Sequence, residues 1–241
     1  MPLYGGYGGY NMAGLTNNNS LIGQGLPKGI TPFVNNHPAW APSLVAAPHN
    51  KIKWNFNSAP PTSNTSSGLP GWTLNIDVEE QELDNWCWCA CVAATHNHAS
   101  PYTRITQCEV ANYGLKRTDC CNLHLSPHPC DKGGAPADAL QKFGNFKSNS
   151  NSKPSFDTVM SEIRNGCPIL VGYARPGTTT GHAILIDEYR LKPDHVKNPA
   201  GRIVVYKDPF YPTAQQVKSA IWDKFETEIG STGKVGYCLT K

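Results

Sequence analysis

Three cysteines fall within five residues in the segment NWCWCAC, at residues 85–91. They are Cys87, Cys89 and Cys91. A cysteine thiolate is a strong nucleophile when a neighbouring base activates it. Cysteine is also among the most commonly buried residues, so all three could simply fill a core. The places of the three side chains on the element that carries them help to decide between these interpretations.

The segment that follows residue 85 is expected to form a helix. Asp84 and Asn85 are both strong N-cap residues, and either would put Cys87 in the first turn. Free backbone N–H groups and the helix dipole stabilise a thiolate there. Cys91 would lie one turn deeper on the same face, as a small buried side chain. Cys89 is about 200° around the helix from Cys87. The pattern therefore favours Cys87 as the reactive thiol.

A histidine and an aspartate are predicted to meet across two neighbouring strands. Three apolar segments with turn residues between them are typical of antiparallel strands: PILVGY (168–173), HAILIDEY (182–189) and RIVVYKD (202–208). If residues 189 and 201 are the last opposed pair of the second hairpin, His182 lies opposite Asp208, about 5 Å away at Cβ. Asp187 competes for the same role, but it is expected about 16 Å along the strand and on the opposite face.

A lone histidine at the start of a strand is more often only a surface residue, so His182 needs support from another feature of the chain. That support comes from QELDNWCW (81–88), which resembles the nucleophile region of papain-like cysteine peptidases. In that family a Gln precedes the catalytic Cys by six residues and a Trp follows it directly. Gln81, Cys87 and Trp88 match these three positions.

The form NWCW, followed by small residues, resembles a bacterial branch of the family that includes plant-pathogen effector proteases and bacteriocin-leader peptidases. The resemblance covers roughly residues 72–241. It includes four further segments: GGAPADAL (133–140), EIRNGCPILVGY (162–173), GHAILIDEY (181–189) and VVYKDPF (204–210). Cys89 departs from the branch, in which small alanine-like residues are usual at this position.

The resemblance implies a role for each of four residues. Cys87 is the nucleophile, His182 the base, and Asp208 the acid that orients the base. The side-chain amide of Gln81 and the backbone N–H of Cys87 would bind the oxyanion. Water then hydrolyses the covalent thioester. This chemistry implies no metal and no cofactor, and the expected partner is a peptide or protein substrate.

Two other classes of function remain open. A Cys-His acyltransferase or deamidase would use the same acyl chemistry with another acceptor. An inactive binding module would keep the fold without the reaction, but the chain retains Gln81, Cys87, His182 and Asp208. The sequence does not separate a peptidase from a transferase or deamidase.

A second cluster of cysteines lies in CCNLHLSPHPC, at residues 120–130. Soft ligands at short spacing suggest a zinc site. Against zinc, the segment has no C-x-x-C pair, and Pro127 and Pro129 stiffen it. The branch that the chain resembles often carries a cysteine clasp here, which implies one or two disulfides among Cys108, Cys120, Cys121 and Cys130. Adjacent cysteines point apart, so Cys120 and Cys121 would bond to different partners. Free thiols are the third alternative.

Residues 1–71 differ in composition from the rest of the chain. They are rich in Gly, Asn, Ser and Pro, and all nine cysteines and every acidic residue lie after residue 76. Such sequence buries too little apolar surface to fold, so it is expected to be largely extended or disordered. It would suit a flexible tail, or a targeting segment or pro-segment that the enzyme removes near Trp72. Residues 72–241 are expected to form the peptidase domain.

Charge and hydropathy exclude several classes of protein. The net charge is +3, and no basic stripe of the kind found in nucleic-acid-binding proteins is present. No run of 18 apolar residues predicts a membrane span. The N-terminus lacks the charged and apolar regions of a cleavable secretory signal. The expected location is therefore the cytoplasm, or the exterior after export by a specialised secretion system. The oligomeric state is left open.

The order of the predicted elements gives the fold class. Helices are predicted first, in 106–117, 135–144 and 155–166, and antiparallel strands follow, including a last one in 233–241. This order is typical of an α+β protein. We expect a papain-like fold, in which an N-terminal helical half packs its nucleophile helix on a C-terminal antiparallel sheet.

The different places of the cysteines on the helix generate the first testable prediction. Cys87→Ala should abolish activity and leave folding nearly unchanged, whereas Cys89→Ala should keep most of the activity. Turnover of a peptide substrate and the thermal melting curve measure the two effects. An inactive Cys89→Ala protein beside an active Cys87→Ala protein would show that the predicted helical register is wrong.

Overall fold

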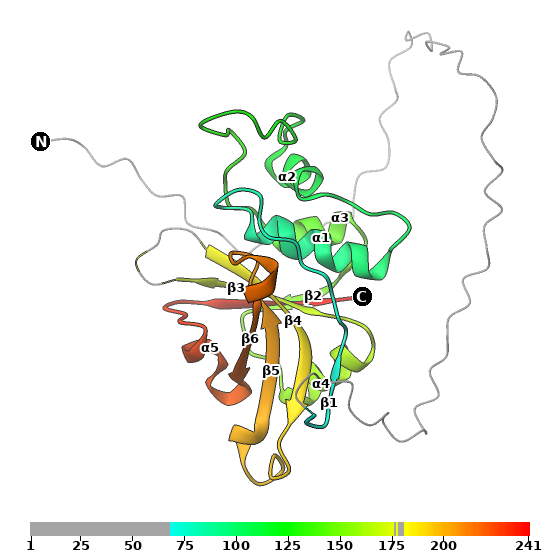
Figure 1. Ribbon diagram of the computed structural model, residues 1–241, viewed down its shortest axis with the longest axis vertical. Helices are drawn as coiled ribbons and strands as arrows, with labels where there is room; N and C mark the ends of the chain where they lie inside the picture. Colours follow the sequence, from blue (N-terminus) through cyan, green and yellow to red (C-terminus); the bar gives the residue numbers. More distant parts are fainter. Residues whose placement is uncertain (1–67, 176, 178–180) are drawn as a thin grey trace, which may run out of the picture. The chain divides into compact units, whose positions relative to one another are not determined.

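The computed structural model describes residues 68–175, 177 and 181–241 (Figure 1). Most of the low-complexity N-terminal segment, and with it the expectation of an extended or disordered chain, lies outside these residues. The described residues combine helices with one seven-stranded antiparallel sheet, so the predicted α+β class is confirmed.

The strands follow the order β2-β7-β3-β4-β5-β6, and β1 pairs with the C-terminal half of β4. They are β1 Gly71–Thr73, β2 Phe146–Ser150, β3 Ile169–Ala174, β4 Gly181–Leu191, β5 Arg202–Lys207, β6 Val217–Ile221 and β7 Val235–Thr240. β3, β4, β5 and β7 are the predicted strands. β1, β2 and β6 were not predicted, because they are short and their sequences do not alternate clearly between apolar and polar residues.

The helices are α1 Cys87–Ala99, α2 Gln107–Leu115, α3 Pro136–Lys142, α4 Phe156–Arg164 and α5 Phe225–Glu228. Short 3-10 turns lie at η1 Pro199–Gly201, η2 Thr213–Gln215 and η3 Trp222–Lys224. α2, α3 and α4 lie where helices were predicted. The sequence explains where two of them start: a capping box formed by Thr106 and Glu109 begins α2, and Pro136 occupies the first position of α3.

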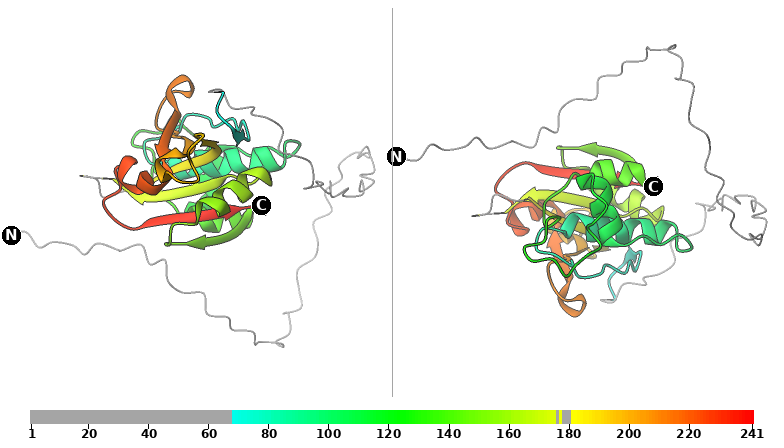
Figure 2. Two further views of the ribbon diagram at one scale, coloured as in Figure 1. Left: turned by 90° about the horizontal axis from the view of Figure 1, so that it is seen from below. Right: turned by 90° about the horizontal axis from the view of Figure 1, so that it is seen from above.

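The sheet separates two apolar cores. One core joins α1, α2 and α3 to side chains such as Leu170, Ala183 and Leu185 on one face of the sheet. The other joins α4, η3 and α5 to the opposite face, through residues such as Val171 and Ile184. Successive residues of β3 and β4 thus alternate between the two cores, as the pleat requires. The views in Figures 1 and 2 show the teal helix α1 lying beside the sheet, with α2 and α3 on the same side.

Helix α1 is buried along most of its length, from Cys87 to His96. It begins one or two residues later than expected. Its N-cap is Trp86, with no side-chain capping bond, so the predicted N-cap at Asp84 or Asn85 is wrong. The side chain and N–H of Asn85 are instead bound to the Asp131 carboxylate, at 3.1 and 2.8 Å. Cys87 becomes the first helical residue and remains in the first turn.

The register between β4 and β5 differs from the one predicted. Leu191 pairs with Arg202 and Leu185 with Lys207, and a bulge lies between Ile186 and Glu188. The prediction placed residue 201 in the strand, but η1 occupies residues 199–201 and shifts the pairing. His182 and Asp208 are therefore not directly opposed. Both lie beyond the last paired residues, and they are related diagonally, a relation that long side chains can still bridge.

A strap formed by residues 70–86 leads from the sheet to α1. Within it, β1 pairs with β4, so that Trp72 lies opposite Tyr189. Further along, the N–H of Leu74 donates to the carbonyl of Asp187, and the N–H of Gln81 donates to that of Pro209, both at 2.9 Å. The boundary expected between residues 71 and 72 falls inside β1. A cut near Trp72 would have to unpair this strand from β4.

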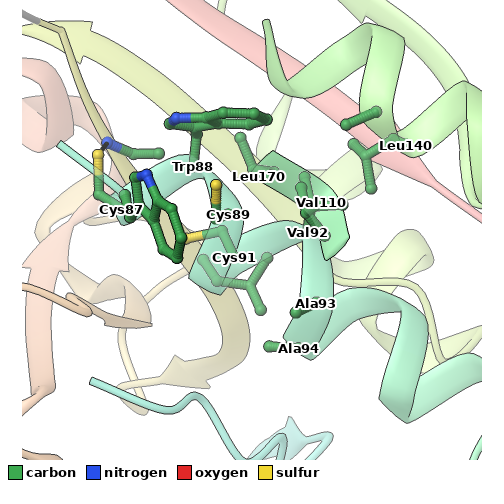
Figure 3. Close-up of a cluster of buried hydrophobic side chains, with 14 of the residues drawn as sticks. Cys87, Trp88, Cys89, Cys91, Val92, Ala93, Ala94, Val110, Leu140 and Leu170 are labelled. Atoms are coloured by element: carbon green, nitrogen blue, oxygen red, sulfur yellow. Dashed lines mark hydrogen bonds between the residues drawn. The ribbon is translucent and has the colours of Figure 1, made fainter. Parts of the chain in front are cut away.

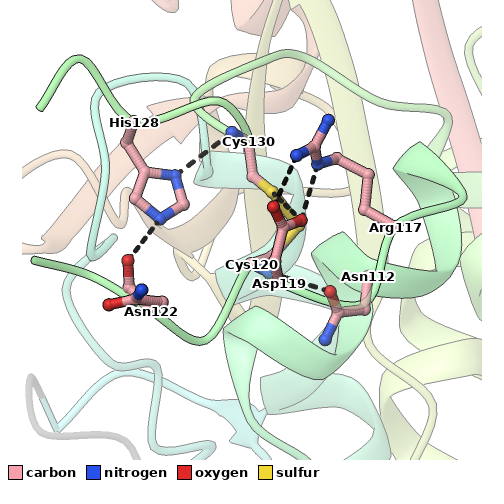
Figure 4. Close-up of polar contacts among 7 residues, drawn as sticks. All are labelled: Asn112, Arg117, Asp119, Cys120, Asn122, His128 and Cys130. Atoms are coloured by element: carbon pink, nitrogen blue, oxygen red, sulfur yellow. Dashed lines mark hydrogen bonds and ion pairs between the residues drawn. A yellow bond between two sulfur atoms is a disulfide. The ribbon is translucent and has the colours of Figure 1, made fainter. Parts of the chain in front are cut away.

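The second cysteine cluster forms two disulfides, Cys108–Cys121 and Cys120–Cys130. Adjacent Cys120 and Cys121 bond to different partners, as predicted. The Cys120–Cys130 bridge, drawn in Figure 4, is buried. The loop that it closes contacts Trp86, the N-cap residue of α1. The indole Nε1 of Trp86 donates to the carbonyl of Cys130 at 2.7 Å.

No helix among the described residues is long and apolar enough to cross a membrane.

The two bridges allow a matched test of their contributions to stability. They close loops of similar length, with separations of 13 and 10 residues. Loop entropy alone would give each about 3 kcal/mol. The double variant Cys120→Ala/Cys130→Ala should lose more stability than Cys108→Ala/Cys121→Ala, because only the inner bridge supports Trp86.

Urea unfolding of both variants measures the difference. Equal losses would show that the bridges act only through chain entropy. Strong reductant should lower the melting temperature of the wild-type protein, and a chelator should leave it unchanged.

Candidate active site

Cys87 stands at the first position of α1, where the helix meets the sheet (Figure 3). The backbone N–H of Ala183, at the start of β4, donates to the Cys87 Sγ at 3.3 Å. Ala183 is the residue after His182, so the thiol lies against the strand that carries the imidazole. Burial raises the pKa of the Cys87 thiol, and hydrogen bonds from the N–H groups of Ala183 and Trp88 act in the opposite direction.

His182 and Asp208 are in direct contact. The His182 Nε2 lies 2.7 Å from the Asp208 Oδ1. The backbone N–H of Phe210 also donates to this oxygen, at 3.1 Å. With Nε2 engaged by the carboxylate, Nδ1 is the ring nitrogen left for proton exchange with another group. The diagonal relation across the ends of β4 and β5 thus brings together the two residues that the sequence suggested.

The imidazole and the carboxylate influence each other's charge. Burial lowers the pKa of His182, and its hydrogen bond to Asp208 opposes that shift. Burial also disfavours ionisation of Asp208. The hydrogen bond from His182 and the charge of the imidazole nevertheless hold the Asp208 pKa below its ordinary value. Asp208 is therefore an ionised hydrogen-bond acceptor at neutral pH.

The two aromatic rings beside the imidazole fix its plane. Tyr173, its cross-strand neighbour on β3, meets the ring edge-on at a centroid distance of 5.6 Å. Phe210 approaches it edge-on at 6.5 Å. Such contacts restrict rotation of the imidazole and keep water from the hydrogen bond to Asp208.

Gln81 lies on the strap, and its side chain folds back onto the turn before α1. The amide Nε2 donates to the carbonyls of Leu83 and Asp84, at 2.9 and 2.6 Å. The Oε1 atom is buried and accepts no hydrogen bond. Both amide protons are thus engaged by the backbone. The amide would have to release one carbonyl before it could bind an oxyanion.

The other two cysteines of the helix are in different surroundings. Cys89 and Cys91 are fully buried in the first core, as Figure 3 shows for the side chains around them. Burial raises the thiol pKa of each far above the ordinary value, with Cys87 as the next cause. Neither thiol ionises near neutral pH. Cys87 is the cysteine of the three that contacts polar groups of the sheet.

Asp187 has a structural partner of its own. The Lys207 Nζ lies 3.5 Å from the Asp187 Oδ2 and also donates to the carbonyl of Ile76 on the strap. Burial raises the pKa of Asp187 to about 6, and Lys207 opposes this shift. Asp187 therefore holds the strap to β4 and β5.

Two tryptophans position the first turn of α1. Trp86 and Trp88 donate their indole N–H groups to the carbonyls of Cys130 and Lys132, at 2.7 and 3.1 Å. The Trp88 ring fills the space next to Gly114 and Gly134, where an added Cβ would come within 2.4 Å of the ring. Glycine is needed at both positions because any side chain would displace the indole.

Among the described residues, the closest group of metal-ligand types is Asp119, Cys120 and Cys130. The two sulfur atoms form a disulfide, and Asp119 pairs with Arg117 at 2.6 Å (Figure 4). This group therefore has no free ligand set to offer a metal ion.

Sequence reasoning missed one charged neighbour of the site. Arg175 follows β3, and its Nη2 lies 3.1 Å from the Asp208 Oδ2. The segment YARPG carries no recognisable motif. The antiparallel pairing of Tyr173 with His182 offers the signal that could have found it, because residues just after Tyr173 must lie near the same end of β4.

The Cys87 thiol, in the first turn of a helix, accepts the N–H of the residue that follows His182, and a buried carboxylate holds the His182 imidazole. Residues of these types can perform nucleophilic acyl chemistry. Comparison with known families agrees with this chemistry. A family model, that of the Peptidase_C39 like family, matches residues 73–237. The chain belongs to this family, and so to the papain-like superfamily of cysteine peptidases. No curated protein matches the chain.

The contacts of the two aspartates generate a matched prediction. Asp208→Ala should lower kcat/KM by about 100-fold or more, because the imidazole loses the group that fixes its tautomer. Asp187→Ala should mainly lower stability, because it leaves the Lys207 charge without its carboxylate. Turnover should be compared at a temperature where both variants remain folded. Equal losses of turnover at equal stability would contradict the assignment of Asp208.

Proposed function

We propose that the protein is a cysteine peptidase that hydrolyses peptide bonds of a protein or peptide substrate through Cys87, His182 and Asp208. One observation carries this proposal. His182, held by Asp208 at 2.7 Å, directly precedes Ala183, whose N–H donates to the Cys87 sulfur in the first turn of α1. The family match supports peptidase chemistry in general.

In the proposed reaction, His182 takes the thiol proton of Cys87 at Nδ1, since Nε2 is engaged by Asp208. The sulfur then forms a bond to the substrate carbonyl carbon, and the carbonyl oxygen becomes an oxyanion. The C–N bond breaks as the imidazolium gives its proton to the leaving amine. Water, deprotonated by His182, hydrolyses the thioester and restores the thiol.

The oxyanion is proposed to bind at the start of α1. The first backbone N–H groups of a helix lack intrahelical partners, and the helix dipole favours negative charge there. The N–H of Cys87 supplies one donor. Gln81 supplies the second when its amide exchanges the carbonyl of Leu83 or Asp84 for the oxyanion. Asparagine at position 81 would be one methylene shorter and should not reach both places.

The branch and the location are finer proposals. NWCW and the segments that accompany it support a secreted effector or toxin of the bacterial effector-protease and leader-peptidase type. The two disulfides support an oxidising compartment at the end of the protein's route, because such bonds are rare in the cytosol. Export by a specialised secretion system would agree with both features.

The experiment that tests the proposed reaction is a digest of a proteome-derived peptide library with wild-type and Cys87→Ala protein, read by mass spectrometry. New N-termini that appear only with the wild type are the expected result. They should disappear when the wild type is alkylated with iodoacetamide beforehand.

Two other results would replace the proposal. Conversion of glutamine to glutamate without new N-termini would identify a deamidase, and transfer of an acyl group to an added amine would identify a transferase. No change in any peptide, with Cys87 nevertheless reactive toward iodoacetamide, would favour a binding module that has kept the fold.

A further inference from the structure

Arg175 is bound to the far side of the proposed catalytic carboxylate. Its Nη2 lies 3.1 Å from the Asp208 Oδ2, while His182 occupies the other oxygen at 2.7 Å. One carboxylate therefore links an imidazole to a guanidinium. The Asp208 side chain is 5% exposed and that of Arg175 is 27% exposed, so water screens this contact only in part.

Phe210 holds the guanidinium in place from the outside. Its ring lies 5.2 Å from the Arg175 Cζ, and the same ring meets the His182 imidazole edge-on. Arginine can stack on an aromatic ring and donate to a carboxylate at once, because its donors lie in the plane of the stacked group. Asp208, His182, Arg175 and Phe210 thus form one connected unit.

From this geometry we propose that Arg175 is a positioning residue of the peptidase site, which fixes the Asp208 carboxylate and supplies the positive charge that balances it. This inference rests on the proposed function of Cys87, His182 and Asp208. Neither the family match nor any sequence motif assigns a role to Arg175.

Charge balance is the physical reason for the role. The reactive state proposed above has a thiolate, an imidazolium and a carboxylate in a buried place, which together carry one net negative charge. Arg175 brings this sum to zero. An uncompensated charge in a site of low polarity is costly, so the guanidinium stabilises the reactive state.

Arg175 shifts the pKa values of the titratable groups around it. Arg175 lowers the pKa of Cys87, of His182 and of Asp208, although burial is the largest influence on each. The hydroxyl of Tyr173 also interacts with Arg175, and burial raises its pKa, so it stays neutral near pH 7. Among the residues that the structure describes, the thiols of Cys89 and Cys91 and the hydroxyl of Tyr206 also interact electrostatically with members of this group.

Loss of the guanidinium charge should therefore shift the pKa values of Cys87 and His182 in a defined direction. Without a positive charge, the thiolate is less stable, so the Cys87 pKa rises. The imidazolium is more stable, so the His182 pKa rises as well. Both limbs of a pH–rate profile should move to higher pH. A residue that only supports the loop would change the height of the profile and leave its position unaltered.

The test uses the full-length protein and two variants of Arg175. Arg175→Gln removes the charge, and Arg175→Lys keeps it without the planar fork. The rate of iodoacetamide alkylation at Cys87, located by mass spectrometry, is measured from acidic to alkaline pH. Arg175→Gln should move the midpoint upward by about one unit. Arg175→Lys should stay near wild type. Peptide turnover should fall about tenfold or more in both, because lysine cannot stack and donate together.

Arg190→Gln is the matched control. Arg190 forms an ion pair with Glu188 on the same strand as His182, eight residues further along and so about 26 Å away. Its removal should leave the alkylation midpoint unchanged. A midpoint in Arg175→Gln equal to that of wild type, or an equal shift in Arg190→Gln, overturns the proposal. Alkylation needs no substrate, so this result stands apart from any failure to find peptide cleavage.

Discussion

The seating of α1 against β4 is the contact on which the candidate site depends. The two elements come from distant parts of the chain, and they meet where the Cys87 sulfur accepts the N–H of Ala183. A helix can approach a sheet this closely only if the side chains at the contact are small, as those of Cys87 and Ala183 are. The size of these side chains thus sets the distance between the thiol and the strand that carries His182.

Three separate sets of contacts fix the position of α1 against β4. The strap is bound to the sheet by Lys207 and Asp187 and by the bond from Gln81 to Pro209. The disulfide-closed loop holds Trp86 from the other side, at the carbonyl of Cys130. Each of these contacts holds a part of the strap, residues 70–86, which leads into α1. The position of the first turn is therefore fixed from both halves of the fold, and not by a capping side chain of its own.

Burial has opposite consequences for different groups in this region. It keeps Cys89 and Cys91 protonated and inert, which leaves Cys87 as the thiol near polar groups. It would also oppose the charges on Cys87, His182 and Asp208, were they alone. Hydrogen bonds from backbone N–H groups and the nearby Arg175 oppose this effect of burial at Cys87 and Asp208, and the hydrogen bond to Asp208 opposes it at His182. The site can be dry and still hold charge because those charges alternate in sign.

The sequence by itself determined the class of fold and the main helices and strands, and it suggested Cys87, His182 and Asp208 as candidate site residues. The elements follow from local patterns, namely small residues at helical spacing and apolar strands bounded by turns. The candidate site rested also on the resemblance of Gln81, Cys87 and Trp88 to papain-like peptidases. Tertiary structure alone decided the β4–β5 register. That register depends on the 3-10 turn at 199–201 and on the bulge near Asp187, and neither feature can be predicted from the local sequence. Tertiary structure also decided the disulfide pairing, the engagement of the Gln81 amide by two carbonyls, and the place of Arg175. Each of these depends on contacts between segments far apart in the chain, and local propensity carries no information about which distant groups will meet.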